Sequence, residues 1–368
     1  MSRLRPRLAL ALGTAAVVLL AGCSAPGAPA TTPSVVAADP AVPLAQLDIL
    51  ADPGSYEGAT TAVLADGAID SPAQAPEQEL PATVASHDLA GDTSVTVSST
   101  ERILAMDISG SIAATVFGLG FGGSVVGRDV STTFAGTEDL PVITSSGHTI
   151  NSEAVIALRP TVLITDGSVG PVDVVLQLRD AGIAVVFVDT DPTVAGVGEL
   201  AQQVAAALGA PAAGESLAAS LTAGIDAKLA EIAAVIPTGA APLRMIFLYL
   251  RGTSGIYYLF GEESGADVLI RSLGGVDVAA EIGLDGMRPM TDEAMVAANP
   301  DLILVMTDGI ASVGGVDGLL ESKPAIALTT AGQHRRFVDM ADGEILAFGP
   351  RTADVLDALA RAIYAPGQ

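Results

Sequence analysis

An internal duplication constrains the fold of this chain more than any other feature. Residues 153–167 read EAVIALRP followed by TVLITDG, and residues 293–309 read EAMVAANP followed by DLILVMTDG. Each copy predicts a helix, a proline that ends it, a buried strand and an Asp-Gly turn. A repeat of this size indicates duplicated domains rather than a short-period solenoid. The expected fold class is therefore α/β, with two Rossmann-like lobes whose strand ends face a cleft.

A long helical stretch separates the two copies. Residues 194–208 and 214–236 are rich in alanine and contain few helix breakers. The second stretch would extend roughly 35 Å at about 1.5 Å per residue, which is enough to join two lobes as a stiff linker. We expect an N-terminal α/β lobe at residues 87–190, linker helices at 191–238 and a C-terminal α/β lobe at 239–368.

The N-terminus predicts export. Arg3, Arg5 and Arg7 form a basic start, and residues 8–20 are an apolar run too short to cross a bilayer. Residues 1–22 are therefore expected to be a signal peptide. The Leu-Ala-Gly-Cys stretch that ends at Cys23 resembles the lipobox of bacterial lipoproteins, in which the cysteine is diacylated and becomes the mature N-terminus. The alternative is a plain signal peptide followed by a chance cysteine.

Cysteine content and charge exclude several kinds of site and partner. Cys23 is the only cysteine, which excludes an internal disulfide and thiolate-based zinc or iron–sulfur sites. Removal of three arginines from 17 basic residues leaves 14, and 14 minus 42 acidic residues gives a mature charge of −28. Such a surface repels nucleic acid and anionic lipid head groups. We expect the lipid on Cys23 to hold the protein at the extracytoplasmic face of the cell membrane.

The segment that follows the signal peptide predicts a flexible tether. Residues 23–86 are rich in Pro, Ala, Thr and Asp and show no sustained periodicity. Such a composition buries too little apolar surface to offset the entropy lost on ordering. Local structure is expected at most in residues 44–64.

A tyrosine and an arginine stand at the end of an apolar strand at residues 245–250. Because side chains alternate along a strand, Tyr249 and Arg251 are expected on the same face, near the end where ligands bind in open α/β sheets. The fixed positive charge of Arg251 favours the phenolate form of Tyr249, and a phenolate is a hard anionic ligand for ferric iron. The alternative is a solvent-facing tyrosine beside an ordinary surface arginine.

A histidine lies in a polar loop of the first lobe. Residues 144–153 lead from a strand into a helix that Asn151 or Ser152 is expected to cap. A loop histidine held by a rigid sheet is a candidate ligand, so His148 is either a ligand or an exposed residue without a role. His87 and His334 are expected to be surface residues.

The features together resemble the substrate-binding lipoproteins of bacterial ABC importers. Two similar lobes, a rigid linker helix, a lipobox and repeated glutamate-bearing helices are similar to class III substrate-binding proteins over about residues 80–366. That class serves siderophores, cobalamin and haem. Residues 127–134 (GRDVSTTF), 147–149 (GHT) and 249–251 (YLR) narrow the resemblance to the HmuT family of haem-binding receptors.

The resemblance implies a ligand and a set of site residues. Haem would be the transported ligand, with His148 and Tyr249 as axial ligands of its ferric iron and Arg251 hydrogen-bonded to the tyrosine oxygen. Met306, at the end of the repeated strand, matches a methionine of the family's haem pocket. Further candidates for that pocket are Arg128, Tyr257 and Tyr258. For these three, the alternatives are an Arg128–Asp129 pair and plain packing of the two tyrosines.

The resemblance also implies partners. Glu153 and Glu293 occupy equivalent positions of the duplication and are candidates for docking against arginines of the permease dimer, which works with its ATPase. The alternative is that they are helix-start glutamates favoured by the helix dipole. Cell-surface haem-binding proteins could donate haem, and nucleic acid is not an expected partner.

Two other functions compete with haem transport. A ferric siderophore or a corrinoid is the alternative cargo for the same fold, although the low number of Arg and Lys residues argues against an anionic siderophore. An enzyme is not expected, because the sequence contains no nucleophile elbow, Ser/His/Asp order or metal-hydrolase motif. Two protein axial ligands would also leave iron no open position for oxygen chemistry.

Overall fold

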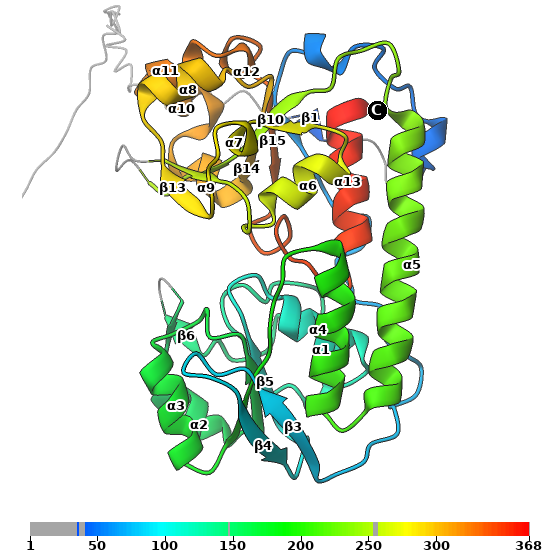
Figure 1. The fold of residues 1–368 in the computed structure, drawn as a ribbon, viewed down its shortest axis with the longest axis vertical. Coiled ribbons are helices and arrows are strands. Elements are labelled where there is room, and N and C mark those ends of the chain that lie inside the picture. Colours follow the sequence, from blue (N-terminus) through cyan, green and yellow to red (C-terminus); the bar gives the residue numbers. More distant parts are fainter. Residues whose placement is uncertain (1–34, 37–40, 146–147, 253–256, 368) are drawn as a thin grey trace, which may run out of the picture. The chain divides into compact units, whose positions relative to one another are not determined.

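The structure has two α/β lobes joined by one long helix, which confirms the predicted fold class (Figure 1). A computed structural model describes residues 35–36, 41–145, 148–252 and 257–367. The predicted signal peptide and Cys23 lie outside the described residues, and so does Gly147. Within the described ranges, every helix is too short or too polar to cross a membrane.

The N-terminal lobe is built on a parallel sheet in the order β5-β8-β9. Its strands are β5 (Ile103–Met106), β8 (Val162–Thr165) and β9 (Ala184–Phe187), and its helices are α1 (Ser111–Gly118), α2 (Ser152–Leu158) and α3 (Val172–Asp180). Its other short elements are η3 (Gly122–Ser124), β6 (Thr144–Ser145) and β7 (Thr149–Ile150). Strands β5 and β8 are buried along their whole length, as expected for a sheet covered on both faces.

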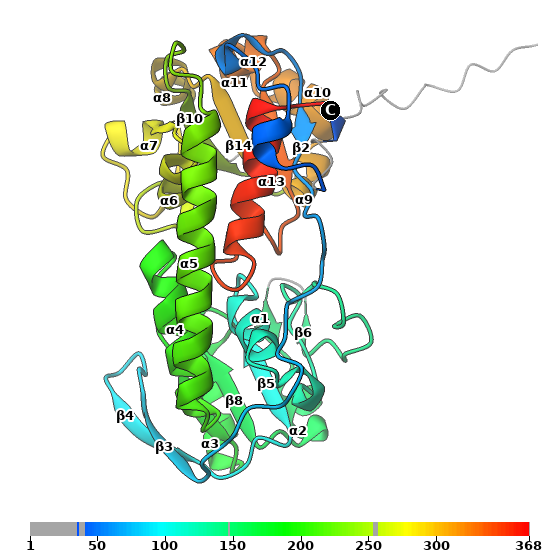
Figure 2. The same cartoon turned by 90° about the vertical axis from the view of Figure 1, so that its right-hand side faces the viewer.

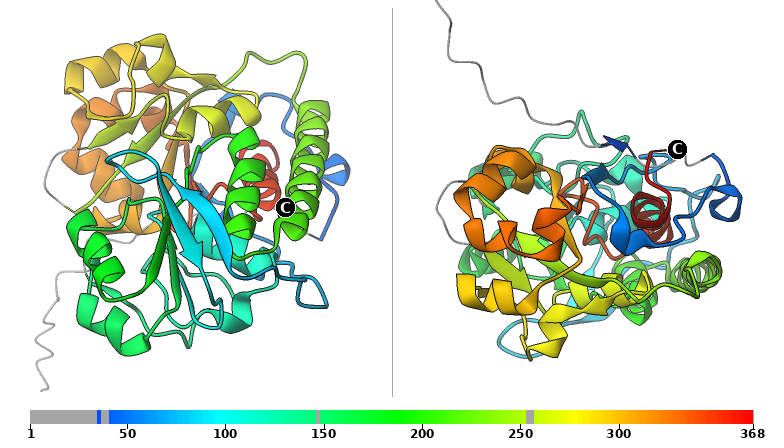
Figure 3. Two further views of the ribbon diagram at one scale, coloured as in Figure 1. Left: turned by 60° about the horizontal axis from the view of Figure 1, so that its bottom comes forward. Right: turned by 90° about the horizontal axis from the view of Figure 1, so that it is seen from above.

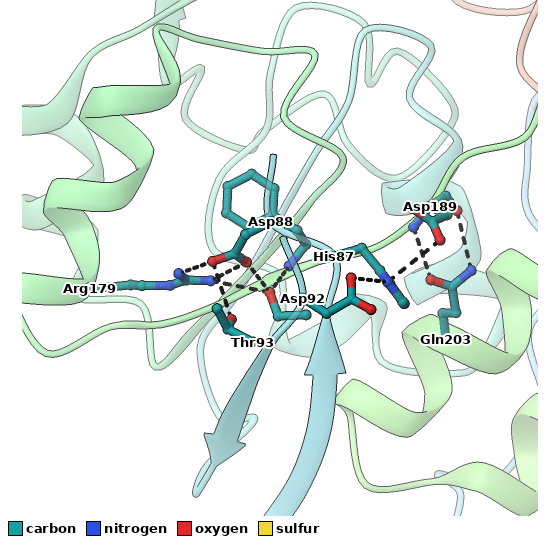
Figure 4. A network of polar contacts seen from close by, with 9 residues as sticks. His87, Asp88, Asp92, Thr93, Arg179, Asp189 and Gln203 are labelled. Carbon is teal, nitrogen blue, oxygen red and sulfur yellow. Dashed lines mark hydrogen bonds and ion pairs between the residues drawn. The ribbon is translucent and has the colours of Figure 1, made fainter. Parts of the chain in front are cut away.

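A hairpin of β3 (Ala82–Ser86) and β4 (Thr93–Val97) is fixed to this lobe by polar contacts (Figure 4). Asp88 pairs with Arg179, whose guanidinium also donates to the Val185 carbonyl (2.8 Å). The hydrogen bond from Arg179 holds the pKa of Asp88 below its usual value, although burial opposes this. His87 Nδ1 lies 3.1 Å from Asp92 Oδ1, so the His87 side chain stabilises the turn of the hairpin.

The C-terminal lobe has a larger mixed sheet in the order β1-β2-β15-β14-β10-β11-β13, with β12 also paired to β10. Its strands are β1 (Val35–Val36), β2 (Thr60–Thr61), β10 (Arg244–Tyr249), β11 (Tyr258–Phe260), β12 (Val276–Asp277), β13 (Met287–Pro289), β14 (Leu302–Met306) and β15 (Phe337–Met340). Strands β10, β14 and β15 run parallel, whereas β11 and β13 are antiparallel to their neighbours.

Helices cover this sheet on both faces (Figure 1). They are α6 (Ala266–Ser272), α7 (Val278–Glu281), α8 (Asp292–Ala298), α9 (Thr307–Ser312), α10 (Gly315–Ser322), α11 (Pro324–Ala327), α12 (Thr330–Gln333) and α13 (Thr352–Tyr364). The central strand β14 is buried from Leu302 to Val305 and only partly exposed at Met306. The strand ends therefore remain accessible where the strand bodies do not.

Two helices lead from one lobe to the other. Helix α4 (Val194–Ala207) packs on the N-terminal lobe, and α5 (Pro211–Val235) is 25 residues long and begins with proline at its first turn. Helix α5 packs against α4 and then against α13 of the second lobe (Figure 3). The predicted linker helix is thus present, with its start three residues earlier than the alanine pattern indicates.

The duplicated segments adopt the same local structure. The Asn151 side chain accepts from the Ala154 N–H (3.1 Å) at the start of α2, and the Thr291 hydroxyl accepts from the Ala294 N–H (3.2 Å) at the start of α8. Both helices end on a left-handed residue and are followed by a strand, β8 or β14. The N-cap at Asn151 is one of the two that the sequence predicts.

Residues 41–86 differ from the predicted flexible tether. Helix η1 (Leu44–Gln46) buries Leu44, η2 (Pro53–Ser55) follows, and β2 pairs with β15 at the edge of the larger sheet. Leu44 and Ala62 are each 2% exposed and belong to the core of the C-terminal lobe. The sequence of this segment has no periodicity of its own. The segment is ordered because a few of its apolar side chains pack into the core of the C-terminal lobe.

The same segment then continues to the N-terminal lobe (Figure 2). The Ser71 hydroxyl donates to the Phe117 carbonyl (2.6 Å), and Gln78 Nε2 donates to the Leu208 carbonyl (2.7 Å). Strand β3 follows directly, so ordered structure of this lobe begins before the predicted boundary at residue 87. The two lobes are thus linked twice, by α5 and by this N-terminal segment.

A buried arginine fastens the N-terminal segment to the second lobe. Arg336 is 1% exposed, donates to Thr60 Oγ1 (3.1 Å) and to the Ile363 carbonyl (2.8 Å), and lies 4.6 Å from the centre of the Tyr56 ring. Burial lowers the pKa of Arg336 to about 10. The side chain thereby ties the segment to α13.

Candidate functional site

A cleft of about 780 Å³ lies where the parallel strands of both lobes end. Its lining includes residues that follow β5, β8 and β9 in the first lobe and residues at or after the ends of β10, β14 and β15 in the second. This is the edge at which open α/β sheets bind ligands, because loops rather than paired backbone occupy it. The volume falls within the range typical of small-molecule sites.

Tyr249 ends β10 and lines the cleft. Its ring stacks on the Phe260 ring at 5.5 Å between centroids and 13° between planes, and Phe260 stacks in turn on Phe247 at 5.1 Å. Strand β11 pairs with β10 so that Phe247 lies opposite Phe260. The stack therefore supports the phenol ring from inside the sheet and leaves it partly exposed to the cleft.

Arg251 lies between two side chains of the cleft, Tyr249 and the acidic residue Asp342. Its guanidinium carbon is 4.8 Å from the centre of the Tyr249 ring, and its Nη2 lies 2.7 Å from Asp342 Oδ2 and 4.0 Å from Met306 Sδ. Burial alone would lower the pKa of Arg251, but the hydrogen bond to Asp342 and the charges of Tyr249 and Asp342 raise it. The positive charge is consequently shared between the tyrosine and the aspartate.

Asp342 is itself held in place. Its Oδ1 accepts from the Asp308 backbone N–H (2.9 Å), and its other oxygen accepts from Arg251. Asp308 and Asp342 each stand two residues beyond the end of their strands, β14 and β15. The second lobe thus presents an ordered row of charged side chains to the cleft.

His148 lines the cleft from the first lobe. It follows the short strand β6 and has a φ of 60°, a left-handed conformation uncommon for a residue other than glycine. Its Nδ1 is buried and has no hydrogen-bond partner among the described residues. A buried ring nitrogen of this kind usually has a hydrogen-bond partner. The His148 imidazole can therefore still form a bond to a ligand in the cleft.

Buried carboxylates organise the rim of the first lobe. The Asp107 side chain accepts from the Ser111 and Ile112 backbone N–H groups, each at 2.9 Å, and so caps α1. Asp129 accepts from the Asp107 backbone N–H (3.1 Å) and thereby ties two cleft loops together. Burial, with the nearby charges of Asp166 and Asp129, raises the pKa of Asp107 to about 7.

Four of the predicted site residues come together in this cleft. They are His148, Tyr249, Arg251 and Met306. Met306 ends β14, next to β10 in the sheet, which brings its sulfur beside Arg251.

The two adjacent tyrosines lie elsewhere, contrary to their predicted place in the pocket. Register pairs Tyr258 with Tyr249, so Tyr257 points to the opposite face of the sheet. Tyr257 is 2% exposed, and its hydroxyl donates to Asp292 Oδ1 (3.1 Å). Burial and the acidic neighbour Asp292 raise the pKa of Tyr257. Tyr258 shares the face of Tyr249, but Phe260 is the residue of β11 that reaches the cleft.

Arg128 is also absent from the described cleft lining. Its Nη1 donates to the carbonyls of Asp129 (3.3 Å) and Thr132 (3.1 Å), in its own loop. The guanidinium stabilises the turn of its own loop, and the pocket role of Arg128 stays a prediction that this geometry does not support. The alternative, an interaction between Arg128 and Asp129, is present only as a hydrogen bond to the Asp129 backbone carbonyl.

Sequence reasoning missed Phe260 and Asp342. Phe260 lies two positions after Tyr258 in a strand with alternating side chains, and Asp342 lies two positions after the end of β15. The rule that placed Arg251 at the cleft would have found Asp342. Phe260 required the register of β11, which the sequence does not specify.

The repeated glutamates lie outside the cleft. Glu153 and Glu293 are exposed in the first turns of α2 and α8. Each helix belongs to a different lobe, and both are on the same side of the molecule in Figure 1. The duplication therefore presents one exposed carboxylate on each lobe at the same structural position.

The fold and the cleft define a two-lobed ligand-binding protein. Polar and aromatic side chains gather at the facing strand ends of two similar lobes, and one long helix joins those lobes. The chain belongs to the periplasmic binding protein family, whose profile matches residues 108–342.

Solved and curated relatives agree with this class. The chain is similar to the heme binding protein HmuT, with 37% identity, a TM-score of 0.79 and coverage of 85% of this chain and 99% of that chain. It is also similar to the periplasmic heme-binding protein RhuT from Roseiflexus sp. RS-1, with 37% identity and a TM-score of 0.66. That match covers 73% of this chain and 100% of RhuT. The uncharacterized ABC transporter substrate-binding lipoprotein YvrC of Bacillus subtilis (strain 168) is 26% identical over 300 residues, which are 80% of this chain and 89% of that protein.

Proposed function

We propose that this chain is a lipid-anchored receptor of an ABC haem importer that holds ferric haem between its lobes, with His148 and Tyr249 as axial ligands. The observation that carries the proposal is that these two side chains, one from each lobe, line the same cleft. Haem is a flat, largely apolar disc with a metal at its centre. A cleft between lobes can cover both faces and supply one ligand to each. The haem-binding proteins to which the chain is similar support haem as the cargo.

Tyr249 is the proposed anionic ligand. The guanidinium carbon of Arg251 lies 4.8 Å from the centre of the Tyr249 ring, where its charge would stabilise a tyrosine oxygen bound to ferric iron. Solved HmuT structures include alanine variants of a tyrosine, of an arginine two positions after it, and of a histidine. Tyr249 and Arg251 have the same spacing, and His148 is the cleft histidine of this chain.

His148 is the proposed neutral ligand. Its unpartnered ring nitrogen shows that the imidazole is not engaged fully by the described protein, so coordination would use a bonding capacity that the fold leaves open. The histidine lies in a loop, where small movements of the backbone can adjust its distance to iron. A neutral ligand opposite an anionic one suits a protein that must release its cargo.

Delivery to a permease is the second part of the proposal. The exposed carboxylates of Glu153 and Glu293, at equivalent positions of the two lobes, would pair with basic residues on the two halves of a permease dimer. A two-fold partner matches a duplicated surface. The lipid on Cys23 would keep the receptor beside that permease, at the extracytoplasmic face of the membrane.

A titration with ferric haem tests the choice of cargo. The chain from Ser24 onward keeps every described residue, and its absorption is followed as haem is added. We expect a saturable Soret band that differs from that of free haem. Cobalamin and a ferric siderophore are tested in the same way, as the alternative cargoes. Saturable binding of either one, with a haem spectrum unchanged from that of free haem, would overturn the proposal.

A further inference from the structure

We infer that the cleft recognises the iron and the porphyrin faces of its cargo and does not bind the two propionates through ion pairs. The inference rests on the proposed haem-binding function and goes beyond it, because it specifies which part of the haem determines selection. It predicts that a porphyrin whose propionates are esterified is accepted at least as well as haem itself.

The lining of the cleft is strongly acidic. Five carboxylates from the two lobes line it: Asp166, Asp191, Glu263, Asp308 and Asp342. Among the described lining residues, Arg251 is the only lysine or arginine. The neighbouring positions outside the described ranges, 146–147 and 253–256, carry Ser, Gly, Thr, Ser, Gly and Ile, which bear no charge. Carboxylates therefore outnumber fixed cations five to one at the site.

The single arginine is already engaged by the protein. Arg251 Nη2 pairs with Asp342 at 2.7 Å, and the guanidinium plane covers the Tyr249 ring at 4.8 Å. A guanidinium binds a carboxylate best through two parallel N–H groups. In Arg251 the guanidinium already contacts Asp342 and the Tyr249 ring, so a ligand carboxylate would have to displace one of these contacts. A propionate would have to compete with an aspartate that is fixed by a second hydrogen bond from the Asp308 N–H.

The remaining lining suits an apolar disc. Apolar side chains of both lobes face the same space: Ile108, Val130, Leu200, Phe260, Met287, Leu346 and Phe348. These side chains can cover a porphyrin, whereas two propionates among five carboxylates would be repelled within a Debye length of roughly 8 Å. Haem therefore enters with its propionates directed to the open solvent side of the cleft.

The test compares two ligands on the same protein. The chain from Ser24 onward is titrated with ferric protoporphyrin IX and with its dimethyl ester, in the same low concentration of organic cosolvent. We expect the dissociation constant of the ester to equal that of haem or to be lower. Binding of the ester more than about tenfold weaker than that of haem would overturn the inference and leave the proposed function standing. Failure of both ligands to bind would overturn the proposed function itself.

A variant supplies a second readout. Asp308→Asn removes one cleft carboxylate and keeps the backbone N–H that Asp342 accepts from. We expect haem to bind about threefold more tightly and the ester to bind as before, because only haem carries the repelled charges. The matched control is Glu321→Gln, on the exposed face of α10 outside the cleft, which is expected to change neither constant. Equal tightening for both ligands, or weaker haem binding, would show that propionate repulsion is not the cause.

Discussion

At the scale of single residues, the cleft depends on how one arginine divides its charge. Arg251 faces the Tyr249 ring on one side and Asp342 on the other, so its positive charge is divided between the tyrosine and the aspartate. Under the proposed function, the positive charge of Arg251 would stabilise an anionic iron ligand at Tyr249.

Replacement of the arginine tests this dependence. Arg251→Ala is expected to retain less haem than the parent, most of all at the acid end of the range, because the proposed anionic ligand then lacks a neighbouring positive charge. The measurement is the fraction of haem retained between pH 5 and 8, read from the Soret band. Arg271→Ala, on α6 outside the described cleft lining, is the control. A retention curve of Arg251→Ala that superimposes on that of the parent would contradict the role given to Arg251.

At the scale of elements, the N-terminal segment is part of the fold rather than a leader to it. Leu44 packs in the same core cluster as Met245 and Phe247 of β10, the strand that carries Tyr249. Strand β2 protects the outer edge of β15 by pairing with it. The segment therefore supports the strands whose ends form the cleft.

Leu44→Ala measures this support. Removal of a buried leucine side chain typically lowers the free energy of unfolding by about 2–5 kcal/mol. We expect a fall of this size in urea denaturation, whereas Gln46→Ala, an exposed residue of the same helix η1, should have little effect. If both variants unfold at the same urea concentration as the parent, the segment does not contribute to the core.

The sequence predicted the elements that periodicity defines and missed those that tertiary contact defines. The duplicated helices and strands have repeated apolar patterns, α5 has a long alanine-rich pattern, and these elements form close to where those patterns lie. Residues 41–86 lack such a pattern, and Leu44 and Ala62 are ordered only because a core exists to receive them.

The site shows the same division. His148, Tyr249, Arg251 and Met306 follow strands that the sequence identifies, and all four line the cleft. Tyr257 lies away from the cleft because the pairing of β11 with β10 puts it on the sheet face opposite Tyr249. Strand register of this kind depends on turn geometry that the sequence does not specify here.

At the scale of the whole molecule, the rim carboxylates link stability to pH. Burial raises the pKa of Asp107 in the folded chain to about 7, well above the ordinary value for an aspartate. The folded chain therefore binds this proton more readily than the unfolded chain. The stability that Asp107 contributes is complete below about pH 4 and is lost as the pH rises through 7.

We expect the free energy of unfolding to fall by about 2 kcal/mol between pH 5.5 and 8 through this group. Urea denaturation at a series of pH values measures the slope, and Asp107→Asn should flatten it. Asp139→Asn, at an exposed position, is the control for the general loss of negative charge. A slope in Asp107→Asn equal to that of the parent would assign the pH dependence to other groups.

The duplicated surface leads to a prediction for transport. Glu153→Lys and Glu293→Lys are each expected to reduce haem uptake by the assembled importer at least severalfold, and the double variant more, while haem binding to the receptor is unchanged. Uptake into vesicles that contain the permease and its ATPase is the measurement. Glu101→Lys, also exposed, is the control. Normal uptake by the double variant would show that these glutamates act only as helix-start residues.

The most direct test of the account is the coordination of ferric haem by Tyr249. Resonance Raman and absorption spectra are recorded for the haem-loaded parent, Tyr249→Phe and His148→Ala. We expect iron–phenolate signals in the parent and in His148→Ala, their loss in Tyr249→Phe, and weaker haem retention in Tyr249→Phe than in His148→Ala, because an anionic ligand holds ferric iron more strongly than a neutral one. Identical spectra and equal retention in the parent and Tyr249→Phe would contradict the proposed site.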